Sequence, residues 1–387
     1  MMQLIELFSE NEYLITFATT AKISERSADL ETLGVKVSDI ELNNGNFDDF
    51  VLKLNPNIVL FDRYITEEQF GWRVSEQCPN ALRILDTEDL HFLRKAREQA
   101  VKQNHPVAEA NLYTDITKRE LASILRSDLS LIISEFELKL LQDKFLISSE
   151  ILHYLPFLIK KESKKAKNLP LFEKRANFIS IGNLHHAPNV DSILYLKNEI
   201  WPLIRKQLPQ VQLKLYGAYA PQKVLELHNE KEGFLIKGWA NDVNEVMSES
   251  RVCLAPLRFG AGLKGKLVDA MINGTPSVTT SLGVEGIPGE LLFPGIIADL
   301  AQEIAEASVV LYSQKEKWMA CQVLASQLLE KRFRKELFSE DFMKKVTLLQ
   351  NGLETHRNAN FIGQILQHQS LQSAKYMSKW IEEKNKN

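Results

Sequence analysis

Short apolar runs alternate with amphipathic stretches of helical spacing along most of this 387-residue chain. A strand followed by a helix forms a βα unit, and a series of such units stacks into a mainly parallel sheet covered by helices. The expected strands are 14–20, 35–42, 57–62, 82–86, 129–134 and 151–155, then 178–181, 212–217, 234–238, 252–257 and 277–280. The pattern therefore predicts an α/β protein.

The alternation occurs in two series, and the length of the chain also suggests two domains. Between 159 and 169 the chain turns to Lys, Glu, Ser and Ala, and the basic run 160–167 is typical of a solvated linker. We predict doubly wound, Rossmann-like domains over 1–160 and 170–350, followed by a helical tail over 351–387. Such domains bind ligands outside the carboxyl ends of their strands, so the cleft between facing domains is the expected site.

The amino terminus departs from this pattern, because residues 1–8 have helical spacing and the first strand run comes after them. In a doubly wound sheet the first strand is central, and its loss opens a gap in the hydrogen-bonded sheet. We therefore expect this domain to lack its first strand in the numbered chain. The full protein is then expected to carry about 20 or more upstream residues, the size of half a βαβ unit.

Composition excludes several classes of protein. The apolar content of 44% and charged content of 25% are those of a globular protein, and a net charge of −3 gives no reason to expect nucleic acid as a partner. Cys78, Cys253 and Cys321 stand singly, as reduced thiols of a cytosolic chain do. No apolar run approaches the roughly 20 residues of a membrane span. We expect a cytoplasmic protein, with loose attachment to a membrane surface as the alternative.

The clearest binding signal is the segment 258–266, R-F-G-A-G-L-K-G-K, which we name the glycine loop. It follows the apolar run 252–257 and precedes the helical stretch 263–272. Such a loop presents backbone N–H groups and a helix amino terminus to an anion, and Arg258, Lys264 and Lys266 add positive charge. The loop therefore predicts a diphosphate site. The alternative is a glycine-rich turn whose basic side chains lie in water.

The second half of the chain contains an ordered series of short segments. They are F-I-S-I-G-N-L at 178–184, P-N-V-D at 188–191, L-K-L-Y-G at 213–217, G-W-A-N-D-V at 238–243, A-P-L-R-F-G-A-G-L-K-G-K at 255–266, D-A-M-I-N-G-T-P-S-V-T-T at 269–280 and S-L-G-V-E-G-I at 281–287. In these segments the second half resembles the donor-binding domain of GT-B glycosyltransferases, particularly family 4 and its relatives. The resemblance covers about 110 residues in the right order, and the first half matches mainly in strand order, helped by I-L-D-T-E-D-L-H at 84–91.

This resemblance implies a GT-B fold and a hexosyltransferase-like enzyme, as found in polysaccharide biosynthesis. It would move a sugar from a UDP- or GDP-sugar to a glycan, lipid or other acceptor, with retention and without a metal or separate cofactor. The donor would bind the carboxyl-terminal domain and the acceptor the other domain. The alternatives are a sugar-nucleotide epimerase of the same fold and a non-catalytic partner protein. An NAD oxidoreductase is disfavoured, because no G-x-G-x-x-G lies between a first strand and its helix.

Loss of a diphosphate from an anomeric carbon places negative charge on the leaving group, so fixed donors are the main catalytic requirement. We predict that Arg258 and Lys264 are the catalytic cations. The backbone of the glycine loop is predicted to lie close to the phosphate oxygens at Gly260, Ala261, Gly262 and Leu263.

Family 4 enzymes carry two Glu residues separated by seven others, and the second binds the ribose hydroxyls. Here the second position is Asp269, a shorter carboxylate that accepts the same hydrogen bonds. The first position is Ala261, which has no carboxylate, so the sugar is held differently, donor choice differs, or activity is weak. The alternative for Asp269 is a solvated acid on a helix surface.

Other strand ends supply the remaining predicted contacts. They are Gly182, Asn183 and His185 after the first strand of this domain, Gly238 and Trp239 for the base, and Glu285 in the G-V-E-G turn. Trp239 as core filler, and His185 with His186 as ordinary loop residues, are the alternatives. Neither histidine has companions with zinc-ligand spacing, so no metal site is predicted.

On the other domain, Asp89 and His91 follow the apolar strand 82–86, together with Asp86 and Glu88. Groups of this kind orient an acceptor hydroxyl or remove its proton, and we predict that role for Asp89 and His91. The alternative is that the acids cap the helix that begins near His91.

Overall fold

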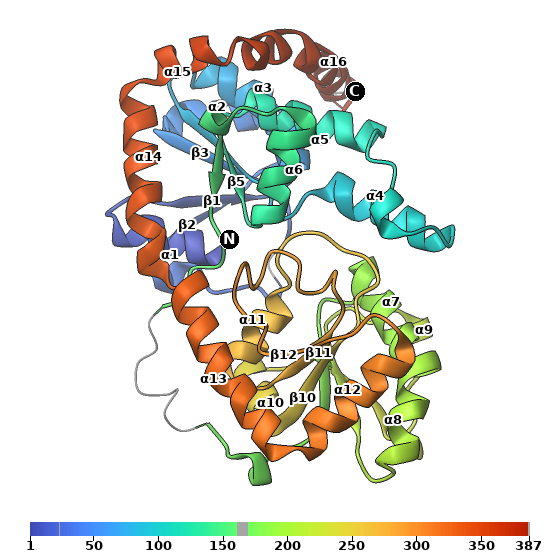
Figure 1. Ribbon diagram of the computed structural model, residues 1–387. Coiled ribbons are helices and arrows are strands. Elements are labelled where there is room, and N and C mark those ends of the chain that lie inside the picture. The colour runs from blue at the N-terminus through green and yellow to red at the C-terminus, as the bar shows by residue number, and fades with distance from the viewer. Residues whose placement is uncertain (23, 161–168, 386–387) are drawn as a thin grey trace.

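A computed structural model of the chain describes residues 1–22, 24–160 and 169–385 (Figure 1). Parallel strands flanked by helices form two domains, which confirms the predicted α/β class. The upper domain in Figure 1 contains the first part of the chain, and the lower domain contains the green to orange part. The predicted linker 160–167 lies, apart from Lys160, outside the described residues.

The carboxyl-terminal domain is built on a parallel sheet whose strand order is β12-β11-β10-β7-β8-β9. The chain runs outward from β7 in one direction and from β10 in the other, so the order reverses between these neighbours. Ligands of doubly wound sheets bind at such a reversal point, beyond the carboxyl ends of the strands. The strands are β7 (Ala176–Ile181), β8 (Leu213–Tyr216), β9 (Phe234–Gly238), β10 (Ser250–Ala255), β11 (Ser277–Thr279) and β12 (Gly295–Ile297).

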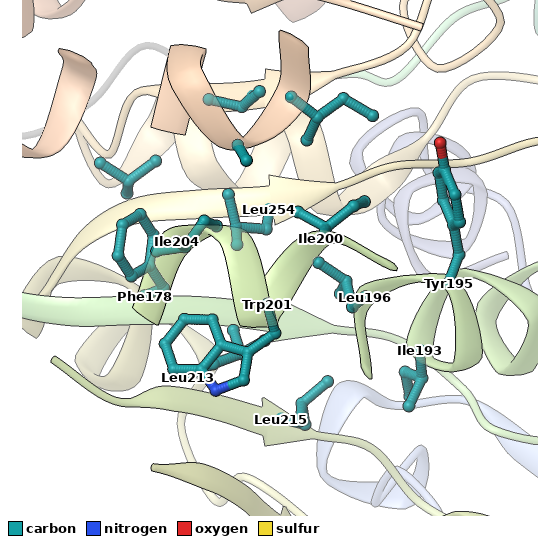
Figure 2. Packing of buried hydrophobic residues seen from close by; sticks show 14 of the residues in the cluster. Phe178, Ile193, Tyr195, Leu196, Ile200, Trp201, Ile204, Leu213, Leu215 and Leu254 are labelled. Carbon is teal, nitrogen blue, oxygen red and sulfur yellow. The ribbon is translucent and has the colours of Figure 1, made fainter. Parts of the chain in front are cut away.

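Helices pack their apolar sides against both faces of this sheet, and Figure 2 shows part of one of the resulting clusters. Trp201, 1% exposed, packs edge-on against Phe178 and Phe234, and its indole N–H donates to the carbonyl of Glu232 at 2.8 Å. The helices of this domain are α7 (Ala187–Tyr195), η6 (Leu196–Ile200), α8 (Trp201–Gln207), α9 (Gln222–Leu225), α10 (Val243–Glu249), α11 (Gly265–Ile272), α12 (Ala301–Ser313) and α13 (Lys315–Arg332).

The amino-terminal domain has a parallel sheet of order β3-β4-β5-β6. Its strands are β3 (Ile58–Asp62), β4 (Leu82–Asp86), β5 (Leu129–Ile132) and β6 (Leu152–Tyr154). The helices around it are α2 (Asn46–Leu54), α3 (Arg63–Gln77), α4 (His91–Lys102), α5 (Asp115–Arg126) and α6 (Glu135–Phe145). The carboxyl ends of β4 and β5 lead into α4 and α6, which face the other domain in Figure 1.

Before this sheet, α1 (Met2–Glu10) leads into β1 (Thr16–Thr19) and β2 (Lys36–Asp39), which pair in a separate small sheet. Within the described residues, β1 pairs with β2 and β3 pairs with β4, and no ladder joins β1 to β3. The expected additional strand stays a prediction.

The end of the chain returns to the amino-terminal domain. Phe342 and Val346 of α14 (Ser339–Asn351) are fully buried in the cluster that contains Leu7 and Leu82. The sequence prediction gave residues up to 350 to the carboxyl-terminal domain, and the structure instead places α14 on the first domain. Two further helices continue over that domain (Figure 1), α15 (Leu353–Ala359) and α16 (Phe361–Asn385).

Candidate functional site

A cleft of about 570 Å³ lies where the carboxyl ends of β7, β8, β9 and β10 face the amino-terminal domain. Glu88, Asp89 and Arg94 line it from that domain. A larger hollow of about 810 Å³ lies between α1 and α14, away from the strand ends. The cleft rather than this hollow is the candidate site, because it coincides with the reversal of strand order.

The glycine loop brings the amino terminus of α11 into the cleft. Gly265 and Lys266, the first residues of the helix, line the cleft, and no side chain caps that end. The first amides of a helix have no intrahelical acceptor, so they are available to an anion. Leu267 and Val268 are buried beneath and hold the helix on the sheet.

Lys264 and Lys266 both line the cleft, and burial lowers the pKa of each to about 8. The Lys264 ammonium donates to the carbonyl of Gly262 at 2.7 Å, and that of Lys266 donates to Oδ1 of Asn189 at 2.7 Å. An anion placed between these ammonium groups raises both pKa values again and keeps both lysines charged.

Arg258 is placed differently from the prediction. Its guanidinium forms a bidentate pair with Asp191 of α7, 2.9 Å from Nε to Oδ2, and lies over the Tyr195 ring. Arg258 is not among the residues that line the cleft, so the structure gives no support to its predicted catalytic role. The sequence pattern identified Arg258 as a cation of the loop, but its side chain pairs with Asp191 outside the cleft lining. Lys266 occupies the cleft instead.

Asp269 lines the cleft one helical turn beyond Gly265, on the same face of α11. Burial raises the pKa of this carboxyl to about 6. The described residues offer the side chain no hydrogen-bond donor at bonding distance, which is unfavourable for a desolvated carboxylate. A ligand that brings hydroxyl groups to this position relieves that cost.

A pH-dependent effect on stability follows from Asp269. Its folded-state pKa of about 6 lies above the ordinary value of 3.8, so its favourable contribution is complete below pH 3.8 and lost as pH rises through 6. Asp269→Asn should therefore raise the free energy of unfolding by about 1 kcal/mol at pH 7.5, allowing for partial exposure, and by less at pH 5. Thermal denaturation of both proteins at the two pH values measures this. An equal change at both pH values would contradict the assignment.

After β7, Gly182 and Asn183 line the cleft. A Cβ on Gly182 would lie 2.7 Å from the Asn189 side chain, so any other residue here requires Asn189 to shift. His185 does not line the cleft, and its ring stacks on Tyr219 with centroids 4.9 Å apart. The neighbouring His186 lines the cleft in its place, and burial lowers the pKa of that imidazole.

After β9, Trp239 lines the cleft with 53% of its surface exposed, so it is not core filler. Gly238 lies just outside the cleft at φ +71°, a conformation suited to glycine. Tyr219, which sequence reasoning missed, lines the same end and is 50% exposed. Its only sequence signal was an aromatic residue following the end of β8. The guanidinium of Arg26 lies 4.8 Å from the Tyr219 ring and 5.6 Å from that of Trp239.

The other predicted loop residues divide into two groups. Gly260, Ala261 and Leu263 line the cleft, whereas Gly262 and Glu285 do not. The Gly262 N–H donates to Glu137, and Glu285 forms a bidentate pair with Arg97 at 2.8 Å for both contacts. Glu137 and Arg97 belong to the amino-terminal domain, so contacts between domains hold both residues away from the cleft.

On the amino-terminal side, Asp89 lines the cleft and accepts a hydrogen bond from Arg94 at 2.8 Å, and burial raises its pKa. His91 lies outside the cleft, edge-on to Tyr64 and 3.4 Å from Asp89. Burial lowers the pKa of His91 to about 3, so the ring is neutral at physiological pH and contacts Asp89 without forming an ion pair.

The loop that holds Asp89 also brings Glu88 to the cleft. Glu88 lines the cleft at φ +56°, and burial raises its pKa to about 7.

The first amides of α4 donate to Glu120, from His91 at 3.0 Å and from Phe92 at 2.7 Å. The acids at 86–89 therefore do not cap α4 at these amides, and the capping alternative is wrong there.

No cluster of three or more His, Cys, Asp or Glu side chains suited to one metal ion occurs in 1–22, 24–160 and 169–385. None of the helices in those same ranges combines the length and apolar character required to cross a bilayer.

Residues 175–313 match the family described as Glycosyl transferases group 1. The chain is also 26% identical over 117 residues to an uncharacterized 44.6 kDa protein in the cps region of Klebsiella pneumoniae. That match covers 28% of this chain and 30% of the other protein, so the chain matches less than a third of that relative's length.

Solved structures share the fold over most of the chain. Sucrose-phosphate synthase from Thermosynechococcus elongatus has a TM-score of 0.66 at 16% identity, covering 90% of this chain and 92% of that one. HepE from Anabaena, in complex with UDP and glucose, has a TM-score of 0.64 at 14% identity, covering 89% and 95%. TarM from S. aureus aligns at a TM-score of 0.57 and 14% identity, covering 79% of this chain and 58% of that one. These likenesses confirm the GT-B fold.

Proposed function

We propose that the chain transfers a sugar from a nucleoside diphosphate sugar to an acceptor, because residues 175–313 match the family described as Glycosyl transferases group 1 and the chain has the GT-B fold. A glycan or a lipid-linked glycan is the proposed acceptor, as in the synthesis of a polysaccharide. Retention at the anomeric carbon is proposed from the family resemblance alone.

One observation carries this proposal, the open amino terminus of α11. Its first amides, Lys264 and Lys266 together present positive charge to one end of the cleft. A diphosphate bound there places its ribose near Asp269, one turn along the helix, whose carboxylate accepts from two vicinal hydroxyls. The lysines and amides stabilise the charge that develops on the departing diphosphate. This charge is the reason for proposing a reaction without a metal.

The base is proposed to lie against Tyr219 and Trp239, whose half-exposed rings line the far end of the cleft. UDP is the proposed nucleotide, because HepE is seen with UDP and glucose, and GDP is the alternative. Glu88 and Asp89 are proposed to face the acceptor. A carboxyl group with a pKa near 7, such as Glu88, suits the exchange of a proton with an acceptor hydroxyl near neutral pH.

The proposal is tested first by calorimetric titration with UDP, GDP and ADP, and then by product analysis with a panel of donors and acceptors. Free nucleoside diphosphate that accumulates only when an acceptor is present supports transfer. Isomerised donor would show an epimerase, and binding without turnover would favour a non-catalytic partner protein. Absence of binding to all three nucleotides would overturn the assignment of the cleft.

A further inference from the structure

We propose that contacts from the amino-terminal domain fix the conformation of the glycine loop, and that Glu137 is the positioning residue that makes the main contact. In this arrangement the affinity for the donor depends on a side chain that does not touch the donor. The inference rests on the proposed function for the identity of the ligand.

Glu137 lies in the first turn of α6 and is fully buried. Its Oε1 accepts a hydrogen bond from the Gly262 N–H at 2.7 Å and another from the Leu90 N–H at 3.0 Å. One oxygen therefore joins the glycine loop to the loop that carries Asp89. Donor-side and acceptor-side segments of the cleft are fixed to the same atom.

Burial of the Glu137 carboxylate is energetically unfavourable. Burial and the nearby charge of Asp89 raise the pKa of Glu137, while the hydrogen bonds from the Leu90 and Gly262 amides and the charge of Lys264 oppose this rise. Its Oε2 is buried without a hydrogen-bond partner. A buried carboxylate with an unsatisfied oxygen is disfavoured relative to an apolar side chain of similar size. Stability alone therefore does not account for an acid at this position, whereas the need to hold two backbone amides does.

A second contact holds the same loop from α4. Arg97 donates from Nη1 to the carbonyl of Gly260 at 2.9 Å and pairs with Glu285 through both terminal nitrogens. The loop is thus held at one amide by an anion and at one carbonyl by a cation. Both come from the amino-terminal domain.

The consequence for the cleft lies in the residues between these contacts. Gly260, Ala261 and Leu263 line the cleft, whereas the Gly262 amide points to Glu137. Fixing Gly262 therefore sets the direction of its neighbours' backbone groups. At position 261 the family resemblance leads one to expect a Glu, and this chain has Ala261. The carboxylate that contacts the glycine loop is instead that of Glu137, from the other domain.

The test compares Glu137→Ala, Glu137→Gln and a matched control, Glu67→Gln. Glu67 is a buried acid of the same domain that binds Arg126 and Ser123, away from the cleft. Calorimetry gives the dissociation constant for UDP, and hydrogen exchange of nucleotide-free protein gives the protection of amides 258–266. Glu137→Ala should weaken UDP binding about tenfold or more and speed exchange in this segment.

Glu137→Gln keeps an acceptor oxygen for both amides, so it should stay within about threefold of the wild type. Glu67→Gln should change melting temperature without changing either readout at the loop. Unchanged exchange at 258–266 in Glu137→Ala would overturn the inference. If Glu137→Ala does not fold, Arg97→Met removes the other contact and gives the same comparison.

The two proposals fail in different ways. Wild-type protein that binds no nucleotide removes the proposed function, and the exchange experiment on nucleotide-free protein still decides whether Glu137 shapes the loop. Wild-type protein that binds UDP, with Glu137→Ala equal to it in affinity and exchange, removes only the further inference.

Discussion

Replacing Lys264 or Lys266 with alanine should lower the rate of sugar transfer by about 100-fold or more, as loss of one preorganised donor at a developing charge typically does. Both ammonium groups line the cleft at the start of α11. Burial lowers the pKa of both ammonium groups, and a charge that is largely removed from water acts with little screening. Steady-state kinetics measures the loss, which should fall mainly on kcat.

Arg258→Ala is the matched control for this prediction, because Arg258 belongs to the same loop but pairs with Asp191 outside the cleft lining. An exposed ion pair contributes little, and activity should stay within about threefold. If Arg258→Ala reduced kcat as much as the lysine variants, the diphosphate would have to lie at the other end of the loop.

Gly262→Ala should reduce kcat/KM by about 100-fold, a size expected when catalytic groups are displaced by a fraction of an ångström. Gly262 has φ +62°, and a Cβ there would lie 2.8 Å from Cβ of Asp89 and 3.2 Å from the carbonyl of Glu88. The added methyl group pushes the loop away from the amino-terminal domain. Donor and acceptor sides of the cleft then separate.

Gly34→Ala separates this steric effect from backbone strain. Gly34 has φ +75°, and a Cβ added there meets no atom within 4 Å. Both variants carry a left-handed alanine, which costs about 1–2 kcal/mol, so Gly34→Ala should lower the melting temperature through backbone strain alone. The loss of kcat/KM should occur only with Gly262→Ala. Equal activity of the two variants would show that contact between the glycine loop and the Asp89 loop has no role in catalysis.

Most strands were predictable because they lie in short runs that are rich in apolar residues and bounded by polar or turn residues, and every expected run overlaps a strand. The exception is β12, Gly295–Ile297, whose three residues after Pro294 are too few to give a periodic signal. The position of α14 was not predictable either. Its amphipathic pattern shows that Phe342 and Val346 must be buried, but not which domain buries them.

The site was predictable where function depends on backbone. The start of α11, Gly182 and Asp269 follow from a strand, a loop and a helix adjacent in sequence, and they line the cleft. The directions of long charged side chains were not predictable from neighbouring residues. Arg258 and Glu285 are directed by Asp191 and Arg97, which are distant in sequence.

By itself, the sequence determined the α/β class, the order of the βα units and the place of the glycine loop between a strand and a helix, because hydrophobic periodicity and glycine conformation act over neighbouring residues. The tertiary structure alone decided that Lys266 rather than Arg258 enters the cleft, and that Glu137 holds the glycine loop from the other domain. Ion pairs and buried hydrogen bonds between distant segments form only when folding brings donor and acceptor atoms within about 3 Å of each other. A pattern of neighbouring residues does not predict which distant groups pair.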